Sequence, residues 1–147
     1  MPVDLEWVER FARERHAAQV DKAGRPYAEH LAAVAGGIAE RGGSPDQIAA
    51  GWLHDAVEDG VLTEAELASL DVPETTRRMV LAMTKRRGEP AADYAARILA
   101  EPGARLVKES DLAHNADPAR LSVLDEPTRQ RLTRKYARMR ELLGLTS

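Results

Sequence analysis

The sequence predicts an all-α protein, a single helical bundle of about eight or nine helices. Ala, Leu, Glu and Arg, which favour helices, dominate the composition. Polar segments rich in Gly and Pro separate stretches in which apolar residues recur with the helical period. We find no substantial alternating pattern of the kind that indicates β-strands. Because 44% of the 147 residues are hydrophobic, we expect residues 1–147 to form one domain with one core.

Each expected helix has its own start or stop signal. Ser44 with Gln47, and Thr63 with Glu66, have the spacing of capping boxes. The residues Gly42, Gly43 and Gly60 are typical of helix ends. The expected helices cover about 4–19, 27–41, 44–60, 63–70, a segment after Pro73 that includes 79–83, 91–100, 104–116, 118–124 and 127–144.

Charge and composition exclude several classes of protein. The formal net charge of −3 argues against nucleic acid and anionic membranes as partners. We interpret the basic residues of the last helix as its solvated face: Arg129, Arg131, Arg134, Lys135, Arg138 and Arg140. The absence of cysteine excludes disulfides, thiolate zinc sites and a cysteine nucleophile. The amino terminus lacks the pattern of a signal peptide, and no apolar run reaches the ~18 residues of a membrane span, so we expect a cytoplasmic protein.

Unusual polar residues interrupt the third expected helix. The segment Gly51–Gly60 places His54, Asp55, Glu58 and Asp59 among core-type residues. At helical spacing, His54 shares a face with Glu58, and Asp55 shares one with Asp59. Burial of such groups without partners would cost on the order of several kcal/mol. A buried ion pair of His54 with Asp55, or a bound metal ion, would remove that cost.

Further metal ligands are available on neighbouring helices. His30 lies in the first turn of the second expected helix, and Asp111 lies in the otherwise mostly apolar segment 107–115. Two imidazoles and two carboxylates suit Mn²⁺, Fe²⁺, Co²⁺ or Mg²⁺, ions that accept octahedral coordination, better than a closed structural zinc site.

The order His30, His54-Asp55, Asp111 resembles the H…HD…D signature of the HD superfamily. Within it, segment 16–30, the HDAVED run at 54–59, Thr84-Lys85 and segment 107–115 resemble the RelA/SpoT-type alarmone hydrolase domain. The resemblance covers about 12–124. The nucleotide synthetase domain of long family members has no counterpart in the sequence, which therefore resembles a stand-alone small alarmone hydrolase.

The resemblance implies a function and a set of site residues. His30, His54, Asp55 and Asp111 would bind one Mn²⁺, which would orient and acidify a water molecule. Glu58 and Asp59 would position or deprotonate that water. The reaction would remove the 3′-pyrophosphate of a guanosine alarmone such as ppGpp and release pyrophosphate. The implied substrate contacts are Asn115, Lys22, Arg25 and Lys85.

Three departures from the family pattern concern substrate recognition. Asp21 stands where guanine-specific members usually have a basic residue, Leu112 stands where Arg is common, and Ala116-Asp117 replaces the usual Thr. An adenosine alarmone or another nucleotide phosphate ester therefore stays open as substrate.

Two other functions also remain open. One is an HD phosphatase, such as a nucleotidase or an NADPH phosphatase. The other is a non-catalytic nucleotide-binding regulator, against which the intact Glu58 and Asp59 argue. The oligomeric state, a homodimer included, is not decided by the sequence.

Four other residues receive mainly structural interpretations. They are His16, Tyr27, Trp52 and His114. For His114, the alternative is a role in the site.

Overall fold

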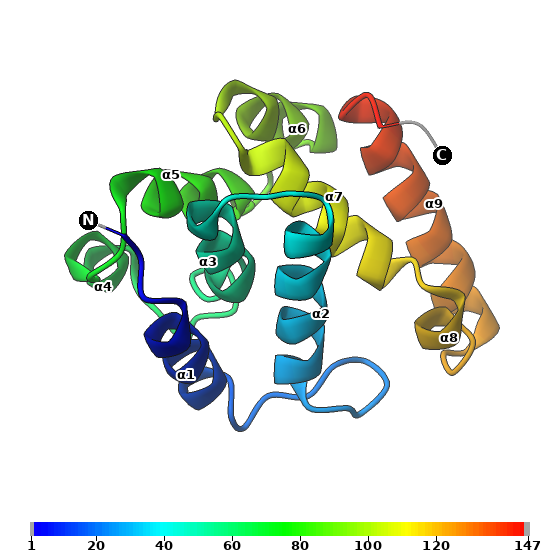
Figure 1. Ribbon diagram of the computed structural model, residues 1–147. Helices are drawn as coiled ribbons and strands as arrows, with labels where there is room; N and C mark the ends of the chain where they lie inside the picture. Colours follow the sequence, from blue (N-terminus) through cyan, green and yellow to red (C-terminus); the bar gives the residue numbers. More distant parts are fainter. Residues whose placement is uncertain (1, 146–147) are drawn as a thin grey trace.

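Nine helices build residues 2–145, the part of the chain that this computed structural model describes (Figure 1). They are α1 (Leu5–Arg15), α2 (Tyr27–Glu40), α3 (Pro45–Leu53), α4 (Glu64–Ser69), α5 (Glu74–Met83), α6 (Ala91–Ala100), α7 (Ala104–Asn115), α8 (Pro118–Leu121) and α9 (Glu126–Leu142). Among residues 2–145 there is no β-strand, and Val20 and Pro26 form one isolated bridge. The predicted all-α class is confirmed.

Both predicted capping boxes are present. The backbone N–H of Gln47 donates to Ser44 Oγ, and the Gln47 side chain accepts from the Ser44 backbone at 2.8 Å. Thr63 and Glu66 make the same exchange at 3.0 Å in each direction. These local signals fix the starts of α3 and α4 in sequence, because each box satisfies backbone donors that the first helical turn leaves free.

Helix α3 lies at the centre of the bundle. It packs against α1, α2, α5 and α7, and its residues Ala49, Ala50 and Leu53 are completely buried. Helices α2 and α7 also pack against each other, and α9 contacts α6 and α7 (Figure 1). This arrangement brings the start of α2, the end of α3 and the second half of α7 to one place.

Helices α2 and α7 approach each other closely at Gly37. A Cβ atom added to Gly37 would overlap the hydroxyl oxygen of Ser110 on α7. That hydroxyl donates a 2.8 Å hydrogen bond back to the carbonyl oxygen of Val34 on α2. The small residue and the cross-helix hydrogen bond therefore set the spacing of the two helices that carry His30 and Asp111.

The predicted continuation of the third helix to Gly60 is wrong, because α3 ends at Leu53 and 54–60 form successive turns. The His54 ring takes the Gly51 carbonyl oxygen at 2.7 Å, the acceptor that the N–H of Asp55 would use in a continued α-helix. Gly60 then adopts a left-handed φ of 77° and closes the turn. The segment 54–60 is thus a series of turns, in which one hydrogen bond of the helical type remains, from the N–H of Asp59 to the carbonyl oxygen of Asp55 at 2.8 Å.

Helix α1 is also shorter than predicted, ending at Arg15 rather than near Gln19. Beyond it the chain forms a loop, in which Tyr27 N–H donates to Gln19 O at 2.9 Å. The Asp21 carboxylate accepts hydrogen bonds of 2.9 Å from the backbone N–H groups of Ala23 and Arg25. The side chain of Asp21 therefore holds the loop in shape.

Other boundaries differ by one to three residues; α8, for example, ends at Leu121, and α9 runs from Glu126 to Leu142. Among the helices of residues 2–145, none combines the length and apolar character that a membrane crossing requires.

Candidate metal centre and its cavity

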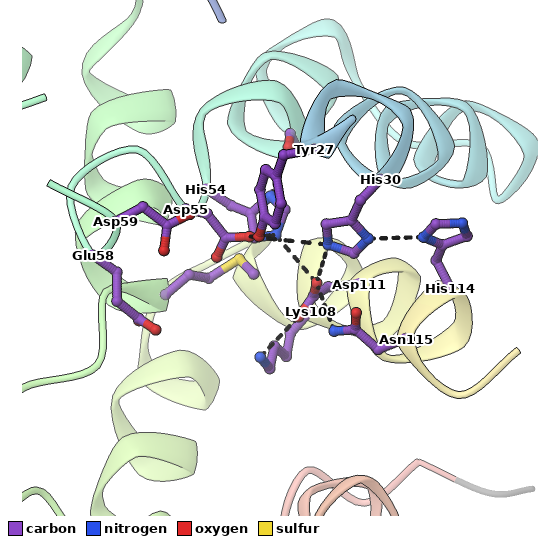
Figure 2. A network of polar contacts seen from close by, with 12 residues as sticks. Tyr27, His30, His54, Asp55, Glu58, Asp59, Lys108, Asp111, His114 and Asn115 are labelled. Atoms are coloured by element: carbon purple, nitrogen blue, oxygen red, sulfur yellow. Dashed lines mark hydrogen bonds and ion pairs between the residues drawn. The ribbon is translucent and has the colours of Figure 1, made fainter. Parts of the chain in front are cut away.

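The four predicted metal ligands lie together in the structure. His30, His54, Asp55 and Asp111 each offer one ligand atom, and these atoms all lie within 4.8 Å of one another. His54 Nε2 is 3.0 Å from an Asp55 oxygen and 3.1 Å from Asp111 Oδ1. His30 Nε2 is 3.0 Å from the same Asp111 oxygen (Figure 2). Residues from α2, from the turn after α3 and from α7 thus converge on one point.

The His54 imidazole is oriented as a metal ligand requires. Its Nδ1–H donates to the Gly51 carbonyl oxygen at 2.7 Å, so in the neutral ring Nε2 carries the lone pair. That Nε2 faces the two carboxylates of the cluster. A backbone carbonyl that fixes the tautomer in this way is the usual support of a metal-bound histidine.

A second chain of contacts orients His30. Its Nδ1 lies 2.7 Å from His114 Nδ1, which also lies 3.1 Å from Arg120 Nη1. A guanidinium only donates, so His114 Nδ1 is the acceptor and His30 Nδ1–H is its second donor. The Nε2 lone pair of His30 then faces the cluster. His114, interpreted mainly as a packing residue, therefore contacts a predicted ligand.

The pKa of His114 agrees with this assignment. Burial of the ring, together with the positive charge of Arg120, lowers the pKa of His114 to about 4. The ring is then neutral at pH 7 and has an acceptor nitrogen available for His30.

The two carboxylates of the cluster are held by neighbouring groups. The Tyr27 hydroxyl donates to Asp55 Oδ2, although we interpreted Tyr27 as a packing residue. Lys108 Nζ lies 2.9 Å from Asp111 Oδ2, and Asn115 donates to Asp111 Oδ1 at 3.1 Å. The two nitrogen and two oxygen donors fit a divalent ion that prefers mixed ligands.

Glu58 and Asp59 lie beside the cluster, on the side away from His114 in the view of Figure 2. A Glu58 oxygen accepts a 2.8 Å hydrogen bond from the backbone N–H of Lys85, and Asp59 accepts one of 2.9 Å from the Gln19 side chain. Both side chains are exposed to the cavity. Partial desolvation, aided by the negative charge of Asp55, raises the pKa of each carboxyl above its usual value.

A cavity of about 930 Å³ opens over these residues. Its wall includes all four substrate-contact residues expected from the sequence: Lys22, Arg25, Lys85 and Asn115. Arg25 pairs with Glu29 at 2.8 Å, and Asn115 is bonded to Asp111. The ammonium groups of Lys22 and Lys85 have no ion-pair partner within residues 2–145.

Lys135 of α9 also lines the cavity, although we interpreted it as part of a solvated face. Partial desolvation, followed by the positive charges of Lys108, Lys85 and Lys22, lowers its pKa. The other three lysines are therefore close enough to influence Lys135. Only the packing of α9 on α6 and α7, which the sequence does not report, brings Lys135 to the cavity.

Asp21 also lines the cavity, and its second oxygen lies 3.6 Å from Arg120 Nη1. With its other oxygen bound to the loop backbone, this carboxylate is occupied on both sides. Trp52, by contrast, is buried in the core as expected.

Comparison with known proteins assigns the chain to a family. A family model described as HD domain matches residues 9–87, a segment that holds three of the four clustered side chains and both flanking acids. This chain belongs to the HD domain family. Asp111, the fourth member of the cluster, lies beyond the matched segment.

Three relatives of this HD domain protein extend the comparison. The chain is 43% identical, over 51% of its length, to a probable guanosine-3′,5′-bis(diphosphate) 3′-pyrophosphohydrolase of Synechocystis sp.. It is 33% identical, over 93% of its length, to a guanosine-3′,5′-bis(diphosphate) 3′-pyrophosphohydrolase of Aquifex aeolicus. A probable GTP pyrophosphokinase of Mycobacterium leprae is 31% identical over 71% of the chain. The chain spans only 10%, 21% and 14% of the lengths of these three proteins.

Proposed function

We propose that this protein is a metal-dependent hydrolase that removes the 3′-pyrophosphate of guanosine 3′,5′-bis(diphosphate) or a similar alarmone. The observation that carries the proposal is the four-ligand cluster with two acids beside it, at the base of a lysine-lined cavity. The Aquifex aeolicus relative, whose name states this activity, aligns with 93% of the chain. The proposal treats residues 1–147 as one domain, in keeping with the packing of α9 on α6 and α7.

In this proposal His30, His54, Asp55 and Asp111 hold one divalent ion, for which we propose Mn²⁺ because of the mixed nitrogen and oxygen donors. Such an ion supplies Lewis-acid activation of the attacking water and of the phosphoryl oxygens. The Gly51 carbonyl and His114 keep the two imidazoles in the tautomers that ligation needs.

Glu58 and Asp59 perform the proton transfers. Water attacks the 3′-phosphorus, the bond from phosphorus to O3′ breaks, and pyrophosphate leaves. One acid takes the proton that the water loses, and the nucleoside O3′ gains a proton to become a hydroxyl. The raised pKa values of both carboxyls suit this task, because a base of higher pKa retains a proton more readily at the working pH.

The lysines bind the phosphate groups. Lys22, Lys85 and Lys135 line the cavity, and Lys108 pairs with Asp111. Lysine is a natural phosphate partner, acting as a point charge. Their spread around the wall supports a substrate that carries phosphates at two positions, as guanosine 3′,5′-bis(diphosphate) does.

A second candidate is hydrolysis of another nucleotide, either an adenosine alarmone or a phosphomonoester. It is favoured by Asp21, an acid whose oxygens are taken by the loop backbone and Arg120. Asp21 therefore does not supply the basic side chain that guanine-specific members use at this position.

The test is a panel of nucleotides incubated with the Mn²⁺-loaded protein. The proposal expects pyrophosphate from guanosine 3′,5′-bis(diphosphate), whereas orthophosphate from other nucleotides would identify the second candidate. Glu58→Gln serves as the control, since it should keep the metal and lose turnover by about 10²–10⁴-fold. Bound metal with no product from any nucleotide would contradict both functions and favour the non-catalytic regulator.

A further inference from the structure

A buried histidine lies behind the acid pair and takes no part in the metal cluster. His16, at the end of α1, is 1% exposed and stacks on the Tyr27 ring with centroids 5.3 Å apart. Its Nδ1 lies 2.7 Å from Gln19 Oε1, and its Nε2 is buried with no hydrogen-bond partner. Burial of a ring nitrogen without a hydrogen-bond partner costs free energy, so we expect His16 to have a role that offsets this cost.

Gln19 joins His16 to Asp59. The Gln19 side chain presents Nε2 to Asp59 Oδ2 at 2.9 Å and Oε1 to His16 Nδ1 at 2.7 Å. A carboxylate only accepts hydrogen bonds, so the amide must turn its NH₂ group toward Asp59. Its oxygen then faces His16, which must donate from Nδ1. The direction of every hydrogen bond in this chain is therefore fixed by the charge of Asp59.

We propose that Gln19 is a positioning residue for Asp59, and that His16 holds the Gln19 amide in the orientation this requires. The chain is needed because Asp59 does not lie on a helix. It belongs to the turn 54–60, and its side chain is exposed to the cavity. Proton transfer from a water molecule to a carboxylate is slower when the carboxylate is not held in one orientation toward that water. The inference rests on the proposed function, since it assigns Asp59 a place in that reaction.

Substitution of Gln19 tests the role directly. Gln19→Ala should lower kcat by about 10-fold or more, part of the ~10²–10⁴-fold that a general base contributes. Gln19 lines the cavity, but its amide oxygen and nitrogen are engaged by His16 and Asp59, so the loss should appear in kcat rather than in KM. The Mn²⁺ affinity should stay unchanged, because Gln19 contacts no predicted metal ligand. Gln130→Ala, on the exposed face of α9, is the matched control and should have no effect.

A double-mutant cycle separates positioning from a general structural role. In the Asp59→Asn background, Gln19→Ala should cause no further loss of kcat, because the group it positions is gone. Losses that add in full would overturn the inference.

Two variants of His16 extend the test. Asn has an NH₂ group near the place of Nδ1, so His16→Asn should restore most of the kcat that His16→Leu loses. Equal kcat values for the two variants would overturn the role of His16, even if both fold less well.

The ring nitrogens of His16 provide a readout that needs neither substrate nor metal. Their ¹⁵N chemical shifts should show a proton on Nδ1, and a ring that is protonated on Nε2 alone would overturn the inference. A wild-type protein without turnover would overturn the proposed function and this role with it. Undiminished turnover in Gln19→Ala would overturn the positioning role alone.

Discussion

Two parts of the cavity are built differently, the metal end and the lysines of the wall. At the metal end the two predicted histidine ligands and Asp111 are buried, and each has a hydrogen-bond or ion-pair partner: His114 for His30, the Gly51 carbonyl for His54 and Lys108 for Asp111. Around the rest of the wall Lys22, Lys85 and Lys135 are exposed, and their ammonium groups have no ion-pair partner within residues 2–145. The side chains of the metal end are therefore held in place before any ligand binds, whereas the lysine side chains become ordered only when an anion binds.

Removal of a predicted metal ligand should have the largest effect on Mn²⁺ binding. Asp55→Ala should weaken Mn²⁺ binding by more than ~100-fold, beyond the ~10–100-fold typical of residues that only support a ligand. Isothermal titration calorimetry with Mn²⁺ measures the affinity, and turnover should fall with it. Asp93→Ala, an exposed acid on α6, is the control. Tight Mn²⁺ binding and activity in Asp55→Ala would contradict the site.

Removal of the hydrogen-bond acceptor that orients His30 should have the next largest effect on Mn²⁺ binding. His114→Phe keeps an aromatic ring but removes the acceptor for His30 Nδ1–H, so Mn²⁺ affinity should fall by about 10–100-fold. His114→Asn retains an acceptor oxygen near the place of Nδ1 and should lose less. The same calorimetric titration compares the two. An unchanged affinity in His114→Phe would show that the metal end does not depend on this chain.

Substitution of one lysine should have a smaller effect, because these lysine side chains are exposed. Lys135→Ala should raise KM by about fivefold, the equivalent of ~1 kcal/mol for an exposed ion pair, and leave kcat unchanged. The effect should shrink at high salt, where exposed charges are screened. Steady-state kinetics at two salt concentrations measures both features.

Arg134→Ala is the matched control for Lys135→Ala, because Arg134 lies on the same helix and outside the cavity wall. Equal KM values for the two variants would remove Lys135 from the substrate site.

A pair of adjacent glycines tests how the helices hold the metal end in place. Gly37→Ala forces a methyl group against Ser110 and should lower the free energy of unfolding by about 1–3 kcal/mol. Gly36→Ala meets no atom within 4 Å and should raise it by up to about 1 kcal/mol through helix propensity. Chemical denaturation measures both. A gain in both variants would show that Gly37 does not set the spacing of α2 and α7.

Local signals in the sequence were enough for most of the fold. The capping residues Ser44 and Thr63 place the starts of α3 and α4 where they were predicted, since a cap acts within one turn. The end of α3 was missed because it depends on a competition that periodicity does not report. The His54 ring takes the carbonyl oxygen that the next helical hydrogen bond would use.

The sequence by itself determined the helical class and brought His30, His54, Asp55 and Asp111 forward as one ligand set, because buried polar groups of these types need a partner. The tertiary structure decided how those groups are supported and what surrounds them. His114 contacts His30, Gln19 reaches Asp59 from a loop forty residues away, and Lys135 lines the cavity from α9. None of these relations follows from spacing along the chain, because each joins segments that meet only when the helices pack.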